Sequence, residues 1–408
     1  MIPFAPPRID QAIIDEVVAT LKSGWITTGP RTKEFEKRLT AYCGNKATLC
    51  LNSATAGLEI MLRWYGVGEG DEVILPAYTY SATANVVIHC GATPVLVDIG
   101  PDFNINTALI KKAITSRTKV IMPVDFGGLP CDYKAIHSIV NDAEVKALFQ
   151  PVTENQIKLG RIMILSDAAH SIGGSADGIK TGGLTDVSVF SFHAVKNLTT
   201  AEGGAIALNF GAPFDNEEIY RYLCVYTLHG QNKDALAKMQ KGNWKYDIVE
   251  AGFKCNMTDL TAAIGLVELA RYESDMLVKR KHICDTYQSY FSKFDWALLP
   301  VLKDDHRETS YHLYPLRIKG ITEAQRDEII KRIFDQDVSV NVHFIPLAML
   351  SFYKKSGYNI ADYPAAYQNF ACEITLPVFY DLSDDQLDTV CRAVSSAVES
   401  VLKTALAG

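Results

Sequence analysis

The chain has 408 residues, a length that can bury a large core and that predicts one large domain with a smaller one, or two comparable domains. Its formal net charge of −7 argues against a nucleic-acid-binding surface, although a local pocket can still attract an anionic substrate. No apolar run is long enough to span a bilayer, and the nine cysteines are scattered and never spaced as C-x-x-C, so we expect reduced thiols in a cytoplasmic protein and neither a disulfide framework nor a zinc site.

The first 45 residues predict an extended arm followed by helices. The N-terminus has no basic segment leading into an apolar core, so we expect no secretory signal. Apolar residues recur at helical spacing through 9–21, and Gly24 follows as a stop. The turn-rich loop 24–30 carries Thr27 and Thr28, which could line a site or belong to a plain connector.

A strand at 47–51 runs into a short stretch of small hydroxylated residues, 52–57, and then into an apolar helix. Free amides at such a turn, with the helix dipole behind them, favour an anion such as phosphate. The Gly-x-x-x-x-Gly-Lys pattern of nucleotide triphosphate loops is absent. Ser53 and Thr55 could equally be ordinary helix caps.

Strands and helices alternate through residues 72–140, which predicts a mainly parallel sheet with helices on its faces. In such sheets the chemistry lies outside the carboxyl ends of the strands. Tyr80 follows one strand end, and Asp167 follows the buried strand 161–165. The carboxylate could cap a turn, or it could face a bound cation or protonated heterocycle. Between them, residues 141–160 are polar without a clear period and predict a surface insertion.

The stretch 189–206 begins as a buried strand and opens into a loop that carries Ser191, His193 and Lys196. It then returns to an apolar strand. A lysine between buried strands is unusual unless it is paired or chemically used. A surface lysine whose stem lies along the sheet edge explains this stretch equally well.

The pattern changes after residue 210. A polar stretch, 230–246, is expected to be mobile, and a strong helix begins near Leu260. We place a boundary inside this helix, which gives a large domain, 1–270, with its N-terminal arm, and a small α+β domain, 271–408. The small domain should contain strands at 311–318 and 338–342 and helices at 324–334 and 384–402.

An anion-binding turn, an aromatic ring, a carboxylate and a lysine at strand ends suit one cofactor, pyridoxal phosphate (PLP). Its phosphate would lie at Ser53 and Thr55, and Tyr80 would stack on its ring. Asp167 beside the pyridine nitrogen would keep that nitrogen protonated, which makes the ring an electron sink. Lys196 would hold the aldehyde as a Schiff base and then serve as a general base.

These residues belong to longer motifs: SGWITTGP at 23–30, NSAT at 52–55, DAAH at 167–170, FSFHAVK at 190–196, AEGG at 201–204 and GFKCNMTD at 252–259. Together they resemble the sugar-nucleotide aminotransferases of the DegT/DnrJ type, a branch of the fold-type I PLP enzymes, over nearly the whole chain. The first motif and the SFHAVKN run look most like the members that aminate a UDP-linked 4-keto-arabinose. The resemblance implies an α/β fold with a large PLP-binding domain and a small C-terminal α+β domain.

The resemblance also implies roles for single residues. Lys196 matches the Schiff-base lysine, Asp167 the acid at the pyridine nitrogen, and Tyr80 the ring-stacking aromatic. His170 stands beside the cofactor's hydroxyl, where many members carry glutamine. The residues that match phosphate binders are Ala54, Thr55 and Ser191.

In the family, the segment that matches residues 252–256 reaches the neighbouring subunit's cofactor, which implies an obligate homodimer with shared sites. Many members carry Asn and Arg where this chain has Lys254 and Asn256, so either side chain could make that contact. His343 fits the family's His-Phe/Tyr motif near the substrate, and Thr28 is a second candidate for a substrate contact. No metal-ligand spacing links the other histidines, which we expect to be structural or surface residues: His89, His137, His229, His282 and His312.

The sequence therefore predicts a PLP-dependent aminotransferase that takes an amino group from glutamate, leaving 2-oxoglutarate and pyridoxamine phosphate (PMP). The amine would pass to a nucleotide-linked keto sugar, at C4 of a UDP- or dTDP-4-keto sugar, in polysaccharide biosynthesis. The same machinery could act on another keto acceptor such as a cyclitol. Related dehydratases carry histidine in place of the lysine, and Lys196 argues against that activity. A non-catalytic regulator with the same fold would need neither Lys196 nor Asp167.

Overall fold

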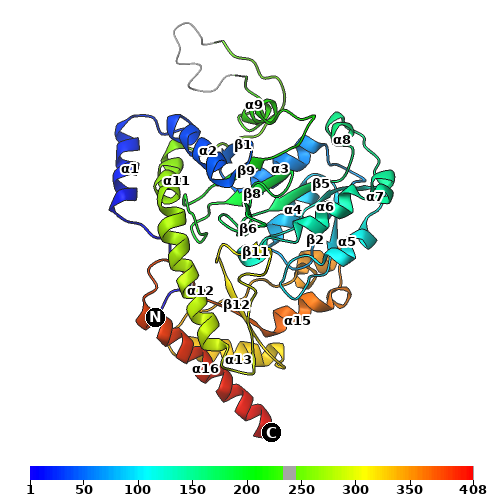
Figure 1. Cartoon of the computed structure of the whole chain (residues 1–408). Coiled ribbons are helices and arrows are strands. Elements are labelled where there is room, and N and C mark those ends of the chain that lie inside the picture. Colours follow the sequence, from blue (N-terminus) through cyan, green and yellow to red (C-terminus); the bar gives the residue numbers. More distant parts are fainter. Residues whose placement is uncertain (233–244, 408) are drawn as a thin grey trace.

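The computed structural model describes residues 1–232 and 245–407 and confirms the predicted α/β architecture (Figure 1). A large sheet with its helices fills the upper part of the view, and a smaller unit of helices and strands lies below it. Most of the polar stretch 230–246, for which mobility was expected, lies outside the described residues. No helix among the described residues has the length and apolar character that crossing a membrane requires.

The large sheet has seven strands among the described residues, in the order β1-β9-β8-β5-β4-β2-β3. Neighbouring strands are parallel except at β9, which runs antiparallel to β1 and β8. The strands are β1 (Ala47–Leu51), β2 (Glu72–Pro76), β3 (Thr93–Val97), β4 (Thr118–Ile121), β5 (Met163–Asp167), β8 (Val187–Ser191) and β9 (Gly204–Leu208). The expected mainly parallel sheet is therefore confirmed.

Helices cover both faces of this sheet, which is why its strands read as continuous apolar runs. They are α2 (Pro30–Cys43), α3 (Ala54–Tyr65), α4 (Ser81–His89), α5 (Thr107–Ala113), α6 (Tyr133–Asn141), α9 (Asn216–Tyr226) and α11 (Asp259–Arg271), with the 3-10 turn η1 (Phe126–Gly128). The first helix, α1 (Gln11–Lys22), packs on α11 at the edge of the molecule (Figure 1). Along β9 the side chains alternate between faces. Ile206 and Leu208 join the core that contains α3, whereas Ala205 and Ala207 join the core that contains α2 and α11.

Parallel pairing places the carboxyl ends of β1, β2, β5 and β8 at one edge of the sheet. Each of these ends leads into a predicted site residue. Ala54 follows β1, Tyr80 follows β2, Asp167 closes β5, and Ser191 closes β8 with Lys196 in the next loop. The sheet topology therefore gathers residues that are far apart in the sequence.

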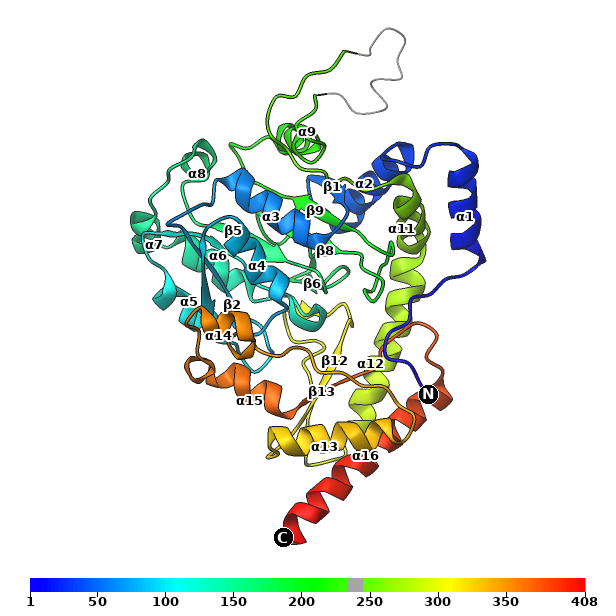
Figure 2. The same ribbon diagram turned by 180° about the vertical axis from the view of Figure 1, so that it is seen from behind.

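The smaller unit has its own sheet, in the order β10-β12-β13, and its own core with α12, α13 and α16. Seen from behind, α13 and α16 close the lower end of the molecule (Figure 2). Its elements are β10 (Ala297–Leu298), β12 (Tyr314–Ile318), β13 (Glu373–Leu376), α12 (Leu277–Phe291), α13 (Glu323–Phe334) and α16 (Asp384–Ala407). Leu347, Tyr353 and Phe370 belong instead to the core of the large sheet; they lie in η3 (Leu347–Met349), α14 (Ser351–Lys355) and α15 (Pro364–Cys372), and η4 (Ile360–Asp362) precedes α15. The prediction of a strand at 338–342 is wrong. In the described structure Val338 and Asn341 form isolated bridges, to Ile2 and Thr375, and no strand.

A continuous helical column joins the two parts of the molecule (Figure 1). It consists of α11, the π-helical turn η2 (Tyr272–Met276) and α12. Tyr272 and Met276 pack into the core beneath the large sheet, and α12 packs into the core of the smaller unit. The division into 1–270 and 271–408 stays a prediction.

Residues 141–160 contain two short helices that the sequence pattern did not predict, α7 (Ala143–Leu148) and α8 (Glu154–Leu159). The buried Gln156 anchors α8, because its side-chain amide donates to the carbonyls of Tyr65 (3.1 Å) and Gly66 (3.4 Å) at the end of α3. Helices of six residues are too short to display a periodic apolar face, which explains why the sequence pattern missed them.

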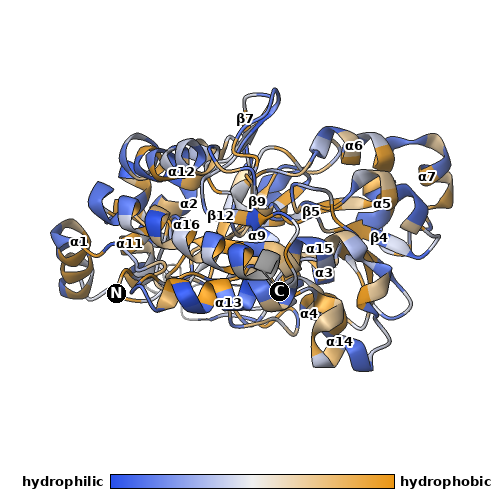
Figure 3. Ribbon diagram, turned by 90° about the horizontal axis from the view of Figure 1, so that it is seen from below, coloured by the Kyte–Doolittle hydropathy of each residue, from blue (hydrophilic) through white to orange (hydrophobic). Residues whose placement is uncertain are grey.

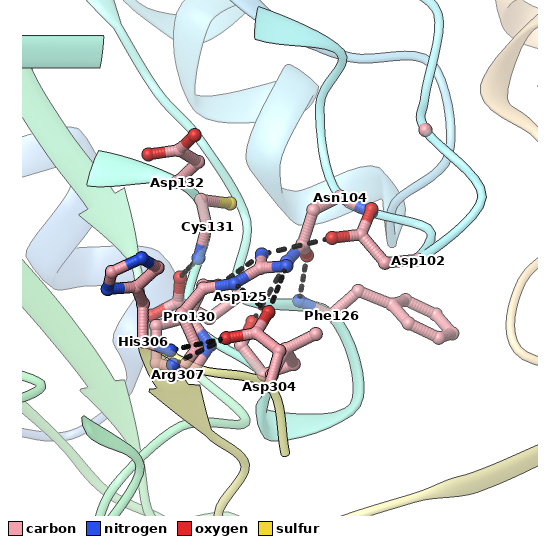
Figure 4. A network of polar contacts seen from close by, with 12 residues as sticks. Asp102, Asn104, Asp125, Phe126, Pro130, Cys131, Asp132, Asp304, His306 and Arg307 are labelled. Atoms are coloured by element: carbon pink, nitrogen blue, oxygen red, sulfur yellow. Dashed lines mark hydrogen bonds and ion pairs between the residues drawn. The ribbon is translucent and has the colours of Figure 1, made fainter. Parts of the chain in front are cut away.

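A third sheet, in the order β11-β6-β7, ties a late segment of the chain to the edge of the site. Its strands are β6 (Ser175–Ala176), β7 (Ile179–Lys180) and β11 (Arg307–Glu308). Figure 4 shows the Arg307 guanidinium at the centre of a polar network, where it donates to Asp304 Oδ2 (2.9 Å), Asp102 Oδ2 (3.0 Å) and the Pro130 carbonyl (3.1 Å). The network therefore holds the loop that follows β4.

We expect Arg307→Met to lower the free energy of unfolding by about 2–3 kcal/mol, because Asp102, Asp304 and the Pro130 carbonyl would lose a charged donor in a partly buried site. Urea unfolding measures this loss. Arg392→Met is the matched control, since this arginine is 73% exposed and its pair with Asp388 should be worth less than about 0.5 kcal/mol. Equal urea midpoints for the two variants would contradict the prediction.

Candidate active site

A cavity of about 390 Å³ opens at the carboxyl edge of the large sheet. Most of the predicted site residues line it: Ala54, Thr55, Tyr80, Asp167, His170, Ser191, Lys196 and His343. The N-terminal arm and the smaller unit complete the wall, through Phe4, His312 and Phe344. The remaining predicted residues do not line this cavity: Thr28, Lys254 and Asn256.

The start of α3 forms an anion-binding surface. Ser53 caps the helix, and its hydroxyl accepts the N–H of Ala56 at 3.1 Å. The N–H groups of Ala54 and Thr55 have no acceptor within the helix, so they can donate to a ligand, and the helix dipole favours negative charge there. Gly204 approaches so closely that a β-carbon at that position would lie 2.4 Å from the Ala54 nitrogen. Only glycine leaves this helix start in place.

Asp167 brings a buried carboxylate to the cavity. It is 6% exposed and accepts hydrogen bonds from Thr83 Oγ1 (2.8 Å) and from the Ala169 N–H (3.3 Å). Burial raises the pKa of Asp167, and the nearby charge of Lys196 opposes that rise. A buried carboxylate that lacks a close cation is costly, so a cationic group on a ligand in the cavity would stabilise it.

Lys196 lies in the loop after β8 and lines the same cavity. Its backbone N–H donates to the His193 carbonyl at 2.9 Å, and the His193 N–H contacts Ser191 Oγ at 3.4 Å. Burial lowers the pKa of Lys196 to about 8, although the charge of Asp167 acts in the opposite direction. At pH 7 roughly a tenth of the amine is therefore neutral and nucleophilic, far more than at the ordinary pKa of lysine.

The contacts of His170 determine which of its ring nitrogens carries the proton. The Gly127 N–H donates to Nδ1 of His170 at 3.3 Å, so in the neutral imidazole Nε2 carries the proton. Burial lowers the pKa of His170 well below its ordinary value, and the charge of Lys196 lowers it further. The loop that carries Gly127 is held in place by Asn104, whose Oδ1 accepts the Phe126 N–H at 3.0 Å (Figure 4). The ring can thus donate to an acceptor atom on a ligand.

His312 also lines the cavity, although the sequence led us to expect a structural or surface residue. The Asn197 amide donates to the Ser310 carbonyl at 2.7 Å, so its Oδ1 accepts, and this oxygen lies 2.8 Å from His312 Nδ1. Nδ1 of His312 therefore carries the proton, and Nε2 is an acceptor. The only sequence signal was the position of Asn197 directly after Lys196, because the contact spans 115 residues.

The opposite wall of the cavity combines Tyr80, which follows β2, with residues of the N-terminal arm and of the segment before η3. Tyr80 is 63% exposed, and its ring lies 5.9 Å from that of Phe344, which leaves it accessible from the cavity. The ring of His343 stacks on Phe4, with centroids 5.6 Å apart, and its Nδ1 lies 3.0 Å from Thr375 Oγ1. Burial lowers the pKa of His343 to about 4, so this ring is neutral at physiological pH.

Thr28, Lys254 and Asn256 form a polar cluster of their own. The Asn256 side chain donates to Thr28 Oγ1 at 2.5 Å, and the Lys254 ammonium donates to Asn256 Oδ1. The Thr28 hydroxyl donates in turn to the Met257 carbonyl. Lys254 is exposed. A single chain therefore does not bring these residues to its own cavity.

The sequence matches the model of the DegT/DnrJ/EryC1/StrS aminotransferase family over residues 7–150 and 156–395. The spore coat polysaccharide biosynthesis protein SpsC of Bacillus subtilis is 37% identical over 406 residues, which cover 98% of this chain and 97% of the relative. An uncharacterised protein of Methanocaldococcus jannaschii, MJ1066, is 38% identical over 400 residues, 97% of each chain.

Solved structures agree with the match to the family model. The PMP form of the putative sugar aminotransferase Spr1654 from Streptococcus pneumoniae superposes with a TM-score of 0.95 at 46% identity, covering 98% of this chain and 100% of that chain. Helicobacter pylori PseC, an aminotransferase involved in the biosynthesis of pseudoaminic acid, superposes with a TM-score of 0.84 at 27% identity, covering 98% and 99%. The resemblance seen in the motifs is confirmed, and the chain belongs to the DegT/DnrJ/EryC1/StrS aminotransferase family.

Proposed function

We propose that this protein transfers an amino group from glutamate to a nucleotide-linked keto sugar, at C4 of a UDP- or dTDP-4-keto sugar. The observation that carries the proposal is the convergence of Lys196, Asp167 and the start of α3 on one cavity. The family supports aminotransfer, and the description of Spr1654 as a putative sugar aminotransferase supports a sugar as acceptor. The likeness to enzymes that aminate UDP-4-keto-arabinose stays a prediction.

The cofactor is pyridoxal phosphate, and the residues of the cavity fit it. We assign the phosphate to the N–H groups of Ala54 and Thr55 and the hydroxyl of Ser191. The buried carboxylate of Asp167 suits the protonated pyridine nitrogen, and the N–H of His170 suits the phenolic oxygen. When bound, the cofactor supplies an aldehyde that exchanges with amines and a ring that withdraws electrons.

The remaining chemistry falls to the side chains of the cavity. Lys196 would hold the cofactor's aldehyde carbon in the resting enzyme and, once released, take the proton from Cα of glutamate. In the second half of the reaction its ammonium would deliver a proton to C4 of the sugar. Asp167 would keep a proton on the pyridine nitrogen throughout. Tyr80 would cover the ring and exclude water from one side.

We also propose a homodimer with shared active sites. Ile14, Val18 and Leu21 are 44%, 38% and 53% exposed and lie on one side of α1, because they are spaced by four and three residues. Figure 3 shows α1 at the edge of the molecule with hydrophobic residues along it. An apolar stripe of this kind is typical of a protein–protein interface. The loop with Thr28 follows α1 directly, so a partner that covers the stripe would approach the cluster with Lys254.

An absorbance spectrum of the purified protein tests the proposed function directly. We expect a visible band of bound PLP that gives way to the spectrum of PMP on addition of glutamate. A UDP- or dTDP-linked 4-keto sugar should then restore the first spectrum. If incubation with PLP produces no visible band, the aminotransferase proposal fails; a band that responds to other amino acids but not to glutamate would reject only the donor.

We predict that Lys196→Ala lowers the turnover rate by several orders of magnitude, because Lys196 is the one lysine among the described residues that line the cavity and can both hold the aldehyde carbon and carry the proton. The visible band should be lost as well. Lys134→Ala, at an exposed position on α6, is the matched control and should keep both. Retained turnover in Lys196→Ala would show that another residue performs these steps.

Asp167→Ala should lower the rate by several orders of magnitude, because the pyridine nitrogen would lose the carboxylate that keeps it protonated. Thr83→Val removes only one hydrogen bond to that carboxylate and should cost about tenfold. Single-turnover kinetics with glutamate measure both effects. A near-normal rate for Asp167→Ala would mean that a different group protonates the ring.

The double variant Val18→Asp and Leu21→Asp should convert the dimer to monomers in sedimentation velocity, since charges on the stripe oppose its burial. Activity should fall with it, because each cavity would lose the partner's contribution. Val152→Asp, at a position that is 77% exposed, is the matched control. A fully active wild-type monomer would reject the shared-site proposal.

A further inference from the structure

Behind His343, the strand β13 carries a buried carboxyl and a buried hydroxyl. Glu373 and Thr375 are two residues apart and therefore share one side of the strand, and both are 0% exposed. The Thr375 hydroxyl bonds to Oε1 of Glu373 and lies 3.0 Å from Nδ1 of His343. Oε2 of Glu373 accepts the backbone N–H of His343 at 3.1 Å. Carboxyl, hydroxyl and imidazole thus form a relay that ends at the cavity.

We propose that Glu373 and Thr375 are positioning residues that determine which ring nitrogen of His343 carries the proton. They would thereby decide whether this imidazole donates or accepts a hydrogen bond to the sugar of the acceptor substrate. The identity of the acceptor rests on the proposed function, whereas the relay rests on the contacts of Glu373, Thr375 and His343 alone.

The relay has two consistent hydrogen-bonding states. Oε2 is occupied as an acceptor, so a proton on Glu373 must reside on Oε1. When Glu373 is ionised, the Thr375 hydroxyl donates to it and can only accept from Nδ1–H of His343, which leaves Nε2 as an acceptor. When Glu373 is protonated, it donates to Thr375, whose own proton then points to Nδ1, and Nε2 carries the N–H.

The two states differ by a single proton, and every transfer balances. A proton from the cavity binds Nε2 of His343, the Nδ1 proton passes to the Thr375 oxygen, and the Thr375 proton passes to Oε1 of Glu373. The imidazole is neutral before and after, since burial holds its pKa at about 4. The change is that Nε2 of His343, an acceptor in the first state, becomes a hydrogen-bond donor to the substrate in the second.

Burial and the basic groups on neighbouring elements together set the pH at which this change occurs. Arg326 of α13 and Arg317 of β12 face Glu373, but within the described part of the chain their hydrogen bonds do not reach its carboxyl group. Arg326 donates to the carbonyls of Phe370 (2.6 Å) and Glu373 (3.3 Å) and to Asp327 Oδ1 (2.6 Å), and Arg317 donates to Asn369 Oδ1 (2.7 Å). Burial raises the pKa of Glu373 to about 8, although the Thr375 hydroxyl, the His343 N–H and both arginine charges lower it.

Lys196 lies near the relay and titrates in the same range, since its pKa is about 8, so the loss of the change in Glu373→Gln is what assigns the change to Glu373. Two other titratable groups near the relay keep one charge across this range. Burial raises the pKa values of Tyr78 and Cys372, so both stay neutral near pH 7. Lys196 is the nearby cation that acts on His343. Below pH 8 Glu373 is protonated and Nε2 of His343 should donate; above pH 8 Glu373 is ionised and Nε2 should accept.

Nitrogen-15 NMR of histidine-labelled holoenzyme reads the tautomer of the ring directly. The signal of His343 is identified by its loss in His343→Gln. We expect the wild type to change from the Nε2–H form to the Nδ1–H form as the pH rises through about 8. Glu373→Gln should keep the Nε2–H form at every pH, because its carbonyl accepts the His343 N–H and its NH2 group must donate to Thr375.

Thr375 provides the second comparison. Thr375→Val removes the hydroxyl and should abolish the change near pH 8, and Thr375→Ser should restore it. Thr389→Val is the matched control, since that exposed hydroxyl donates to the Asp385 carbonyl of its own helix, at 2.9 Å, and lies outside the relay. The KM of the wild type for a UDP-linked 4-keto sugar should change about tenfold between about pH 7 and about pH 9, and Glu373→Gln should lose this dependence.

A Glu373→Gln protein in which the His343 signal still changes near pH 8 would overturn the proposal. If that variant does not fold, the comparison of Thr375→Val with Thr375→Ser decides, and equal pH dependence in both would also overturn it. The spectral response of each sample to glutamate is recorded in parallel. Its absence in the wild type would reject the proposed function and leave the NMR test of the relay unaffected.

Discussion

The burial of a carboxylate at the end of β5 is the constraint on which the rest of the site depends. Asp167 cannot turn toward water, because β5 is paired with β4 and β8 on its two sides and both oxygens of Asp167 are held by hydrogen bonds. Such a group is stabilised by a ligand that brings positive charge. The same low-polarity surroundings keep part of the Lys196 amine neutral. One physical effect, desolvation, thus produces both a carboxylate that favours a cationic ligand and an amine that is partly neutral.

His170 and His312 are neutral, and each presents either a hydrogen-bond donor or an acceptor to the cavity. His170 is fixed by a backbone N–H and His312 by the side chain of Asn197, so one ring offers a donor and the other an acceptor. Burial keeps both rings neutral, since it lowers their pKa values well below the ordinary value. Recognition of charge is left to Asp167 and to the start of α3. The site therefore separates the recognition of charge from hydrogen bonding by neutral rings.

Much of this arrangement could be predicted from the sequence, because the ends of short apolar strands can be located from the residue pattern. Thr55, Asp167 and Lys196 each follow such a strand, and parallel topology gathers strand ends at one edge. His312 could not be recognised in this way, since its place in the cavity depends on a contact with a distant asparagine. The helices α7 and α8 were missed because they are too short to show a period. The family motifs pointed to Lys254, but the chain alone does not carry it to the cavity.

The column formed by α11, the π-helical turn and α12 limits where residues can be inserted into or deleted from this chain. Tyr272, the first residue of the turn, donates to the Ile172 carbonyl at 2.7 Å and accepts from Asn197 at 3.2 Å, beside the active-site loop. Farther along the same column, Ile283 and Tyr287 are buried in the core of the smaller unit. Each helical residue turns the chain by about 100°, so one inserted or deleted residue between these points would rotate that face out of its core. An insertion or deletion in this column would therefore disrupt the core of the smaller unit.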